Sequence, residues 1–355
     1  MEINQLFLDG HKLIHHLDVV EDFMKGKTIV PIHAEISPTS LCNQNCRFCY
    51  RDFDGHKSQS LSREVFLGLI RSLAEVGVKS VLLAGDGEPL MNEYTPDAIV
   101  LGREMGLDMA LNSNAVLLTE GIIKKILPSL TWIRFSVMSP EIETYKQIHG
   151  VKKDHLRVAI DNIKKCVEFK REHGLDVTIG IQQVLLRENA TQVFQEAQMA
   201  KTIGVDYYVL KPFSKHNENT YSTDEDLHIQ YHEELQKAER LTDGSFNCII
   251  RWNTFEDKGV RDYEKCYGIP FIAQIGADGG FYSCCPFFGM KEFSFGNLYE
   301  KSFEEILRSE RRKVVIKNII DNVNVHKDCM TYCRHHQINK FLWTLENSPA
   351  HLNFI

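Results

Sequence analysis

The stretch "SPTSLCNQNCRFCYRDFDG", residues 37–55, places Cys42, Cys46 and Cys49 within eight residues. A disulfide between two of them would leave one thiol over, so a disulfide does not explain the set. Three thiolates can instead bind three corners of a cubane iron–sulfur cluster, and the fourth iron then lacks a protein ligand. Catalytic metal sites keep such an open position for substrate. The alternative is a three-cysteine zinc site completed by His56 or another histidine.

The flanking sequence predicts a parallel β-sheet with helices on its outer face. Six apolar, β-rich runs alternate with amphipathic segments. They are 33–39, 79–85, 107–113, 131–138, 176–186 and 206–213. Such repetition predicts a parallel sheet, either doubly wound or rolled into a barrel, with its chemistry at the carboxyl ends of the strands. The cysteines follow the first run, and "GDGEP" (85–89) and "NSN" (112–114) end the next two, so all three features would share one rim.

Bulk composition limits the function. The chain has 355 residues, of which 43% are hydrophobic and 25% charged, as in an ordinary globular protein. A net charge of −7 argues against a nucleic-acid-binding surface. The N-terminus has no signal-peptide features and no apolar run reaches about 18 residues, so we expect no membrane span and a cytoplasmic protein. In a reducing compartment, clustered cysteines are more often metal ligands or catalysts than disulfides.

The Cys-x3-Cys-x2-Cys spacing after a first strand, with Phe48 before the last cysteine, resembles the radical S-adenosylmethionine (SAM) superfamily. A second motif supports the resemblance, which covers residues 33–214. "AGDGEPL" (84–90) is similar to the Gly-Gly-Glu-Pro strand end of that family, with Asp86 in place of the first glycine. The resemblance implies an α/β fold, a partial (β/α)6 TIM-like barrel, which matches the number of predicted strands.

The resemblance also implies roles for individual residues. The three cysteines would hold a [4Fe–4S] cluster whose open iron binds the amino and carboxylate groups of SAM. Glu88, preceded by Gly87, would accept hydrogen bonds from the SAM ammonium group, and Phe48 would lie near the adenine. Contacts to the ribose and carboxylate are expected at three strand ends, from Asn114, Ser136 and Gln182. One electron, from a flavodoxin- or ferredoxin-type donor, then cleaves SAM to methionine and a 5′-deoxyadenosyl radical, which abstracts hydrogen from substrate.

The sequence pattern changes after about residue 215. From residue 244 onward there are short segments, glycines and cysteines, without further alternation of strands and helices. We therefore expect a helical N-terminal extension at 1–32, the barrel at 33–239, and a smaller metal-stapled region at 240–355. Within that region, residues 266–313 are similar to the SPASM/twitch auxiliary region of radical SAM enzymes, through "DGGFYSCC" (278–285) and "FGNLYEKSFEEIL" (295–307).

This second resemblance implies one auxiliary [4Fe–4S] cluster. Its four expected ligands are Cys266, Cys284, Cys329 and Cys333. The Gly-x4-Cys spacing fits Cys284 and Cys285 equally well, and Cys284 is preferred. Five cysteines follow residue 260, fewer than the roughly seven that two clusters would need, so the likeness is closer to a one-cluster twitch region. A structural zinc site with four thiolates is the alternative.

Several other residues stand out. Cys166 and Cys248 are expected in the core, as small hydrophobic side chains. Cys285 is a structural residue, an alternate ligand, or a thiol that donates hydrogen to a radical. Lys211 ends the sixth run, where it could bind a substrate anion, with a surface lysine as the alternative. "HKLIHHLD" (11–18) is expected to form a helix that packs on the barrel.

These features predict a radical SAM oxidoreductase with an auxiliary cluster that accepts one electron from the substrate radical. This resembles the twitch-type dehydrogenase that oxidises an alcohol on an aminocyclitol. Because the segment ahead of the barrel is too short for a peptide-recognition domain, we expect a small polar substrate such as a sugar or cyclitol. The alternatives are an epimerase or a peptide-modifying maturase with Cys285 or Cys248 as hydrogen donor. The non-enzymatic alternative is a zinc-stapled binding protein.

Overall fold

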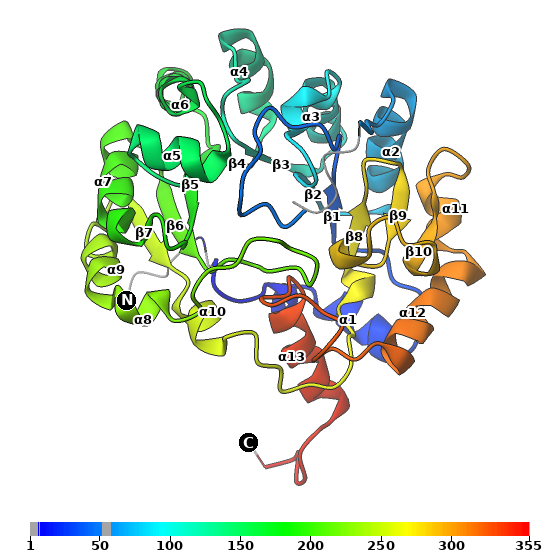
Figure 1. The fold of residues 1–355 in the computed structure, drawn as a ribbon. Coiled ribbons are helices and arrows are strands. Elements are labelled where there is room, and N and C mark those ends of the chain that lie inside the picture. Colours follow the sequence, from blue (N-terminus) through cyan, green and yellow to red (C-terminus); the bar gives the residue numbers. More distant parts are fainter. Residues whose placement is uncertain (1–5, 7, 52–57, 355) are drawn as a thin grey trace.

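The computed structural model describes residues 6, 8–51 and 58–354. Within them one sheet runs in the order β10-β9-β8-β1-β2-β3-β4-β5-β6-β7. Its strands are β1 (His33–Ile36), β2 (Ser80–Leu83), β3 (Asp108–Ser113), β4 (Trp132–Ser136), β5 (Thr178–Val184), β6 (Tyr207–Lys211), β7 (Asn247–Ile250), β8 (Ile272–Ile275), β9 (Gly280–Tyr282) and β10 (Ser294–Asn297). Figure 1 shows the sheet curling into an open barrel with most of the helices outside it.

The helices follow the strands in regular alternation through the barrel. They are α1 (Leu17–Met24), α2 (Arg63–Val76), α3 (Thr95–Glu104), α4 (Glu120–Ile126), α5 (Ile142–His149), α6 (His155–His173), α7 (Val193–Ile203), α8 (Leu227–Gln230), α9 (His232–Glu239), α10 (Trp252–Asp257), α11 (Phe303–Leu307), α12 (Glu310–Asn322) and α13 (His336–Glu346). Caps explain several of the boundaries. α6, for example, starts where the Asp154 side chain accepts from the Arg157 N–H and ends at Gly174. Its Cys166 is fully buried, as predicted.

Strands β1 to β7 pair in chain order, and every pair is parallel. The six runs expected from the sequence contain β1 to β6, and the partial (β/α)6 barrel is confirmed. Side chains alternate between the two faces of each strand. Ile133 and Phe135 of β4 pack in the main core with Leu210 of β6, which leaves Arg134 and Lys211 on the inner face of the barrel.

The expectation of no further strand–helix unit after residue 244 is wrong. Strand β7 pairs parallel to β6, with Cys248 opposite Tyr208, so the parallel sheet continues past residue 240, the expected start of the auxiliary region. The segment "FNCII" is only a short apolar run, and such a run does not distinguish a strand from other core segments. Cys248 is buried in the main core on the helix side, as expected of a core residue.

The auxiliary part continues the same sheet. Strand β8 pairs parallel to the remaining edge of β1, with Ile275 opposite Ile36, and β9 and β10 follow as antiparallel strands. Phe281 of β9 packs against Phe295 and Phe303, with ring centroids 5.0 Å apart in both pairs. The first strand of the barrel is therefore also the attachment point of the auxiliary region.

Segments from both ends of the chain cover the side that the sheet leaves open (Figure 1). The helix expected at 11–18 is a 3-10 turn, Leu13–His15, followed by α1. Leu13 and Val20 form a small separate core with Phe271, before β8, and Leu342 of α13. Leu6 and Leu8 pack against inward-facing residues of β6 and β7, namely Tyr207, Val209 and Ile249.

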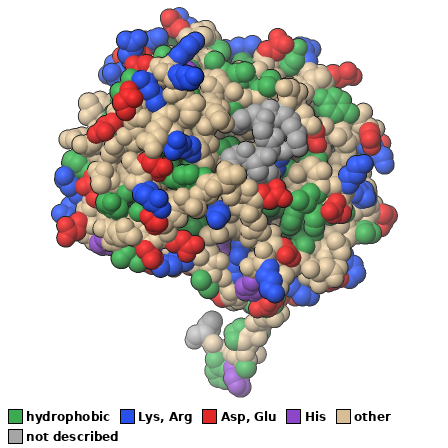
Figure 2. All heavy atoms as spheres, in the orientation of Figure 1, with side chains coloured by type: hydrophobic (Ala, Val, Ile, Leu, Met, Phe, Trp, Pro, Cys, Tyr) green, Lys and Arg blue, Asp and Glu red, His purple; other side chains and the backbone are tan. Residues whose placement is uncertain are grey.

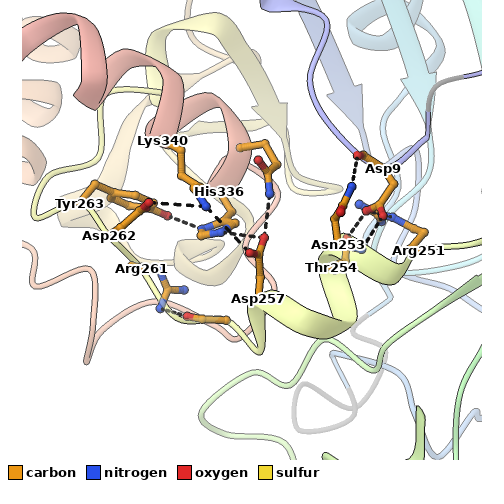
Figure 3. Close-up of polar contacts among 12 residues, drawn as sticks. Asp9, Arg251, Asn253, Thr254, Asp257, Arg261, Asp262, Tyr263, His336 and Lys340 are labelled. Carbon is orange, nitrogen blue, oxygen red and sulfur yellow. Dashed lines mark hydrogen bonds and ion pairs between the residues drawn. The ribbon is translucent and has the colours of Figure 1, made fainter. Parts of the chain in front are cut away.

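Helix α10 ties these covering segments together (Figure 3). Asp9 caps its first turn, because its carboxylate accepts from the Asn253 N–H at 2.8 Å and from the Thr254 hydroxyl at 2.6 Å. At its other end Asp257 lies 3.3 Å from Nε2 of His336 in α13. The six-residue helix α10 thus holds both the N-terminal segment and the last helix, α13.

Figure 2 shows acidic and basic side chains interspersed over the face of the molecule that looks toward the viewer in Figure 1. Among the described residues, no helix is both long enough and apolar enough to cross a membrane.

Candidate active site: two groups of cysteines at the barrel rim

The three clustered cysteines lie on the loop that follows β1, at the carboxyl end of the strand. Burial raises the pKa of the Cys42 thiol to about 11, and Glu88 and Cys49 add to the effect. Burial, Cys49 and Cys42 together raise the pKa of Cys46 well above its usual value. Such thiols are costly to ionise unless a bound cation takes up the charge, so their grouping fits a metal centre.

The cysteine loop is fastened to the end of α5. The Asn45 N–H donates to the His149 carbonyl at 3.1 Å, and the Arg47 N–H donates to the Ile148 carbonyl at 2.9 Å. Gly150 ends α5 in the left-handed region at φ +61°, and a Cβ there would lie 2.1 Å from the Asn45 carbonyl oxygen. A glycine is therefore required for this close approach.

His149 is a residue of this site that the sequence analysis missed. Its Nδ1 lies 3.2 Å from Cys46 Sγ and 2.8 Å from Gln44 Oε1, while the Gln44 amide donates to the Tyr145 hydroxyl at 2.9 Å. The Tyr145 and His149 rings stack at 3.9 Å. Burial lowers the pKa of His149 to about 3, so the ring is neutral. No local sequence signal marks His149, because its partners are about 100 residues away.

The loop after β2 packs directly on the cysteine loop. A Cβ on Gly87 would lie 2.2 Å from the Leu41 carbonyl oxygen, and the Glu88 N–H donates to that same oxygen at 2.9 Å. Asp86, which departs from the family pattern, accepts from the Tyr50 hydroxyl at 3.3 Å and lies 3.6 Å from Arg51. Asp86 thus holds Tyr50 and Arg51, the two residues after Cys49, beside the loop that follows β2.

Glu88 is buried, and burial raises the pKa of its carboxyl group to about 7 against the opposing effect of its hydrogen bonds. Its two oxygens accept from the Ser113 hydroxyl and the Asn114 N–H, both at 2.8 Å. The carboxylate therefore fixes the end of β3 beside the cysteines. Its role toward the SAM ammonium group remains a prediction.

Asn43, the hydrogen-bond partner of the Asn114 side chain, carries an unpaired polar group. The Asn114 side-chain amide donates to Asn43 Oδ1 at 2.6 Å, while the buried Asn43 Nδ2 has no hydrogen-bond partner among the described residues. A buried donor without a partner is costly. Asn43 directly follows Cys42 in the chain, so an unpaired donor here fits a site that a bound cluster or SAM would complete.

The other residues expected to contact SAM lie on the same rim. Ser136 ends β4 and is paired with Gln182 of β5, and both are half-buried. Phe48 stands edge-on to His149, with ring centroids 5.7 Å apart, and packs beside the small core of Met138 and Val184. Their contacts with SAM remain predictions.

Lys211 ends β6 on the inner face and is half-buried, so it is not a surface lysine. Burial, together with the charges of Arg134, Arg251 and Arg334, lowers the pKa of its ammonium group to about 7, against the opposing effect of Glu35.

The auxiliary cysteines are also brought together. Cys266 and Cys329 contribute to the raised pKa of Cys333, and Cys285, Cys333 and Cys266 contribute to that of Cys284. The Cys266 sulfur accepts from the Asn339 side-chain amide at 3.4 Å and from the Gly268 and Ile269 N–H groups. Several N–H donors on one sulfur suit a thiolate that ligates a cluster.

Cys284 and Cys285 both remain candidates for the fourth ligand. Cys284 is buried, and its sulfur lies 3.9 Å from Nδ1 of His335, a second histidine that the sequence did not reveal. Cys285 is half-buried and acts on the pKa of both Cys329 and Tyr50. Cys285 therefore lies within electrostatic reach of both the auxiliary thiol Cys329 and Tyr50, the residue after Cys49. Cys248 is on the helix side of β7, which removes it as a hydrogen donor at the barrel rim.

Direct contacts connect the two groups of cysteines. The guanidinium of Arg51 lies over the Phe288 ring at 5.9 Å. The loop between β6 and α8 (residues 212–226) spans the same gap. There the Asn219 amide donates to the Cys49 carbonyl at 3.1 Å, and His216 Nε2 lies 3.3 Å from the Pro286 carbonyl.

The donor sets suit iron–sulfur clusters. Three thiols on one loop with the unpaired amide of Asn43 fit a cluster that keeps one iron for SAM, and the thiols around Cys266 fit an auxiliary cluster. Within 8–51 and 58–354 no group of three or more His, Cys, Asp or Glu side chains is arranged to hold a single metal ion. His56, the alternative zinc ligand, lies outside the described residues.

Comparison with known families agrees with this geometry. Residues 36–188 match the radical SAM superfamily, and residues 266–335 match the SPASM iron–sulfur cluster-binding domain. The chain therefore contains a radical SAM domain and a SPASM domain. This radical SAM protein is therefore an enzyme that uses SAM and a [4Fe–4S] cluster, and its SPASM domain binds auxiliary iron–sulfur. That its five cysteines hold one auxiliary cluster remains a prediction.

Curated relatives of this radical SAM protein are distant. It is 22% identical to the tungsten-containing aldehyde ferredoxin oxidoreductase cofactor-modifying protein of Pyrococcus furiosus, over 77% of this chain and 80% of the relative. It is 28% identical to a probable GTP 3′,8-cyclase of Saccharolobus islandicus over 48% of this chain, and it spans about half of the cyclase, 53%.

Solved structures with the same fold include Streptococcus suis SuiB bound to SAM, with a TM-score of 0.63 and 16% identity over 84% of this chain and 70% of SuiB. Another is anSMEcpe with bound SAM, with a TM-score of 0.61 and 18% identity over 87% of this chain and 88% of that one. At these identities the likeness concerns the fold.

Proposed function

We propose that this radical SAM protein is an oxidoreductase that removes two hydrogens from a small polar substrate of the sugar or cyclitol kind. The observation that carries the proposal is that the two cysteine-bearing parts adjoin. Arg51 lies directly over Phe288, and the loop of residues 212–226 bridges the two parts through Asn219 on Cys49 and His216 beside Pro286. Because the barrel rim and the auxiliary thiols adjoin, a substrate held at the rim lies next to both.

When bound, the first cluster and SAM supply a 5′-deoxyadenosyl radical, and the auxiliary cluster supplies a one-electron acceptor. The substrate carbon gives up a hydrogen atom, and the resulting radical loses a proton from its hydroxyl group and one electron, so that an alcohol becomes a carbonyl. Cys42, Cys46 and Cys49 hold the first cluster, and Glu88 and Asn114 orient SAM. The barrel walls exclude water that would otherwise compete.

A small substrate is in line with the curated relatives, whose names describe a cofactor-modifying protein and a GTP 3′,8-cyclase. It also fits the inner face of the barrel, which presents single polar side chains such as Gln182 and Lys211.

The test begins with anaerobic purification and analysis of iron, sulfide and zinc. About eight irons per chain agree with two [4Fe–4S] clusters, whereas zinc without sulfide would support a zinc-stapled binding protein. The protein is then incubated with SAM and dithionite, or with a flavodoxin or ferredoxin, and metabolites are screened by mass. A product lighter by two hydrogens, formed together with 5′-deoxyadenosine, supports the dehydrogenase. No 5′-deoxyadenosine under any of these conditions overturns it.

The position of Cys285 favours a second candidate, an epimerase or peptide-modifying maturase that returns a hydrogen atom to the substrate. Its thiol is half-buried, hydrogen-bonded with Cys284 and close to Tyr50. For that function, turnover in D2O places deuterium on the substrate carbon, and Cys285→Ala abolishes turnover while 5′-deoxyadenosine still forms. A carbonyl product without solvent deuterium contradicts it.

A further inference from the structure

Basic side chains from four separate elements meet on the inner face of the barrel, where two carboxylates accompany them. The basic residues are Arg134 of β4, Lys211 of β6, Arg251 directly after β7 and Arg334 directly after Cys333. Each of the three arginines lowers the pKa of Lys211, so the four groups share one neighbourhood. The carboxylates are Glu35 of β1 and Asp9 of the N-terminal segment.

Two of the four cations have a carboxylate partner. Arg334 forms an ion pair with Glu35, and Arg334 and His33 keep the pKa of that carboxyl group low, at about 2, despite its burial. Arg251 forms an ion pair with Asp9 at 3.6 Å, and the two side chains face each other in Figure 3. These pairs balance their own charges.

The other two cations, Arg134 and Lys211, have no carboxylate within ion-pair distance among the described residues. Glu35, which is already paired with Arg334, acts on both of them only from further away. Arg134 contacts neutral groups, since its Nε donates to Asn112 Oδ1 at 3.2 Å and its guanidinium lies 5.2 Å from the Trp132 ring centroid. It also hydrogen-bonds Tyr207. The Lys211 ammonium has no hydrogen bond or ion pair with any residue in the described part of the chain. Half-buried cations that lack a close counter-charge are costly, and a bound anion would reduce that cost.

The strand register places these two cations beside the expected SAM contacts. Arg134 lies two residues before Ser136, on the same face of β4. Ser136 is opposite Gln182, while Lys211 is opposite Val184, two residues further along β5. Arg134 thus lies two residues before the Ser136–Gln182 pair and Lys211 two residues after it, so an anion held by both would lie beside this pair, where SAM contacts are expected.

We propose that Lys211 and Arg134 bind an anionic group of the substrate, a carboxylate or a phosphate. The proposal rests on the proposed function, because it names a chemical class for the substrate of that reaction. A guanidinium can bind either group through two parallel hydrogen bonds, and the ammonium adds a point charge. A neutral sugar or cyclitol would leave both cations unpaired, so the substrate is an acid or a phosphate ester of such a molecule.

The test uses the full chain, reconstituted anaerobically with iron and sulfide. Its melting temperature is measured against inorganic phosphate and, separately, acetate, with chloride keeping the ionic strength constant. The unsubstituted protein is compared with Lys211→Met, Arg134→Gln and Lys301→Met, the last changing an exposed lysine before α11. Lys211→Met is the more informative variant, because replacing a half-buried charge without an ion pair by an apolar side chain of similar length does not threaten folding.

We expect a saturable rise in melting temperature with phosphate, acetate or both. The anion that raises the melting temperature identifies the substrate group as a phosphate or a carboxylate. The half-saturating concentration should be unchanged in Lys301→Met and about tenfold or more higher in Lys211→Met and Arg134→Gln, as for the loss of a charge-assisted hydrogen bond. Equal half-saturation in Lys211→Met and the unsubstituted protein, or no saturable rise with either anion, overturns the proposal.

The two proposals fail separately. Formation of 5′-deoxyadenosine from SAM and dithionite by the unsubstituted protein tests the radical reaction and needs no anion. Anion binding that depends on Lys211 without 5′-deoxyadenosine overturns the proposed function alone. Formation of 5′-deoxyadenosine without anion binding that depends on Lys211 overturns the anion site alone.

Discussion

At the scale of single residues, Glu196 is a clear source of destabilisation at neutral pH. Its carboxyl group is buried in α7, neither oxygen has a hydrogen-bond partner among the described residues, and burial raises its pKa from 4.5 to about 8. The folded state therefore keeps a proton that the unfolded state loses between pH 4.5 and 8, so this residue lowers stability progressively as pH rises through that window.

We predict that Glu196→Gln raises the free energy of unfolding at pH 7, by on the order of 3 kcal/mol at most. The gain should disappear as the pH falls to about 4.5. Denaturant unfolding at several pH values measures it, with Glu172→Gln, an exposed position in α6, as the control. A gain that does not depend on pH would contradict the assignment.

Lys211 gives the opposite pH dependence. Its pKa is about 7 in the folded chain and 10.5 without the fold. Below pH 7 it carries an unpaired charge that opposes folding, and between pH 7 and 10.5 the unfolded state binds more protons, so stability recovers. We predict that Lys211→Met raises the melting temperature most below pH 7, with a difference that shrinks toward pH 10.5. A constant difference across this range would show that the charge is not responsible.

The sequence reveals the residues of this site whose signal is local. Three cysteines in eight residues and the Gly-Glu-Pro strand end are readable without a structure. His149 and Asn43 are not, because their importance comes from contacts such as Cys46 with His149, 103 residues apart. The choice between Cys284 and Cys285 also stays open, since adjacent thiols reach the same neighbours.

At the scale of elements, the loops after β1 and β2 depend on close backbone approach. In Gly87→Ala the new Cβ would lie 2.2 Å from the Leu41 carbonyl oxygen, so one loop has to move. We predict that this variant folds but retains clearly less iron at the first cluster after anaerobic reconstitution, as measured by iron analysis.

Gly68→Ala provides the matched control, because its Cβ in α2 would meet nothing within 4 Å. An alanine in a helix is also favoured over glycine, by about 1 kcal/mol. Equal iron retention in the two variants would mean that the close approach is not needed for the cluster.

Some strands could be predicted from the sequence and others could not. Strands β1 to β6 follow from long apolar runs separated by amphipathic helices, which is a strong periodic signal. Strand β7 has four residues, and its place in the sheet is set by pairing with β6. Likewise, the pairing of β8 with β1 is a long-range contact that no local pattern announces.

At the scale of the whole molecule, the two groups of cysteines should be separable. We predict that Cys266→Ala lowers the iron content from about eight to about four per chain, retains formation of 5′-deoxyadenosine and loses the two-hydrogen oxidation. Cys42→Ala should lose both reactions. Iron analysis with product quantification by mass checks the pair, and unchanged oxidation in Cys266→Ala would rule out the auxiliary cluster as electron acceptor.

The pairing of β1 with β8 has a consequence for synthesis on the ribosome. Glu35 and Gln274, which hydrogen-bond across this pair, are 239 residues apart. At about 5–20 residues per second, one edge of β1 waits roughly 10 to 50 seconds for its partner during translation. An unpaired edge is a template for aggregation, so a nascent chain of this enzyme needs shielding until β8 emerges.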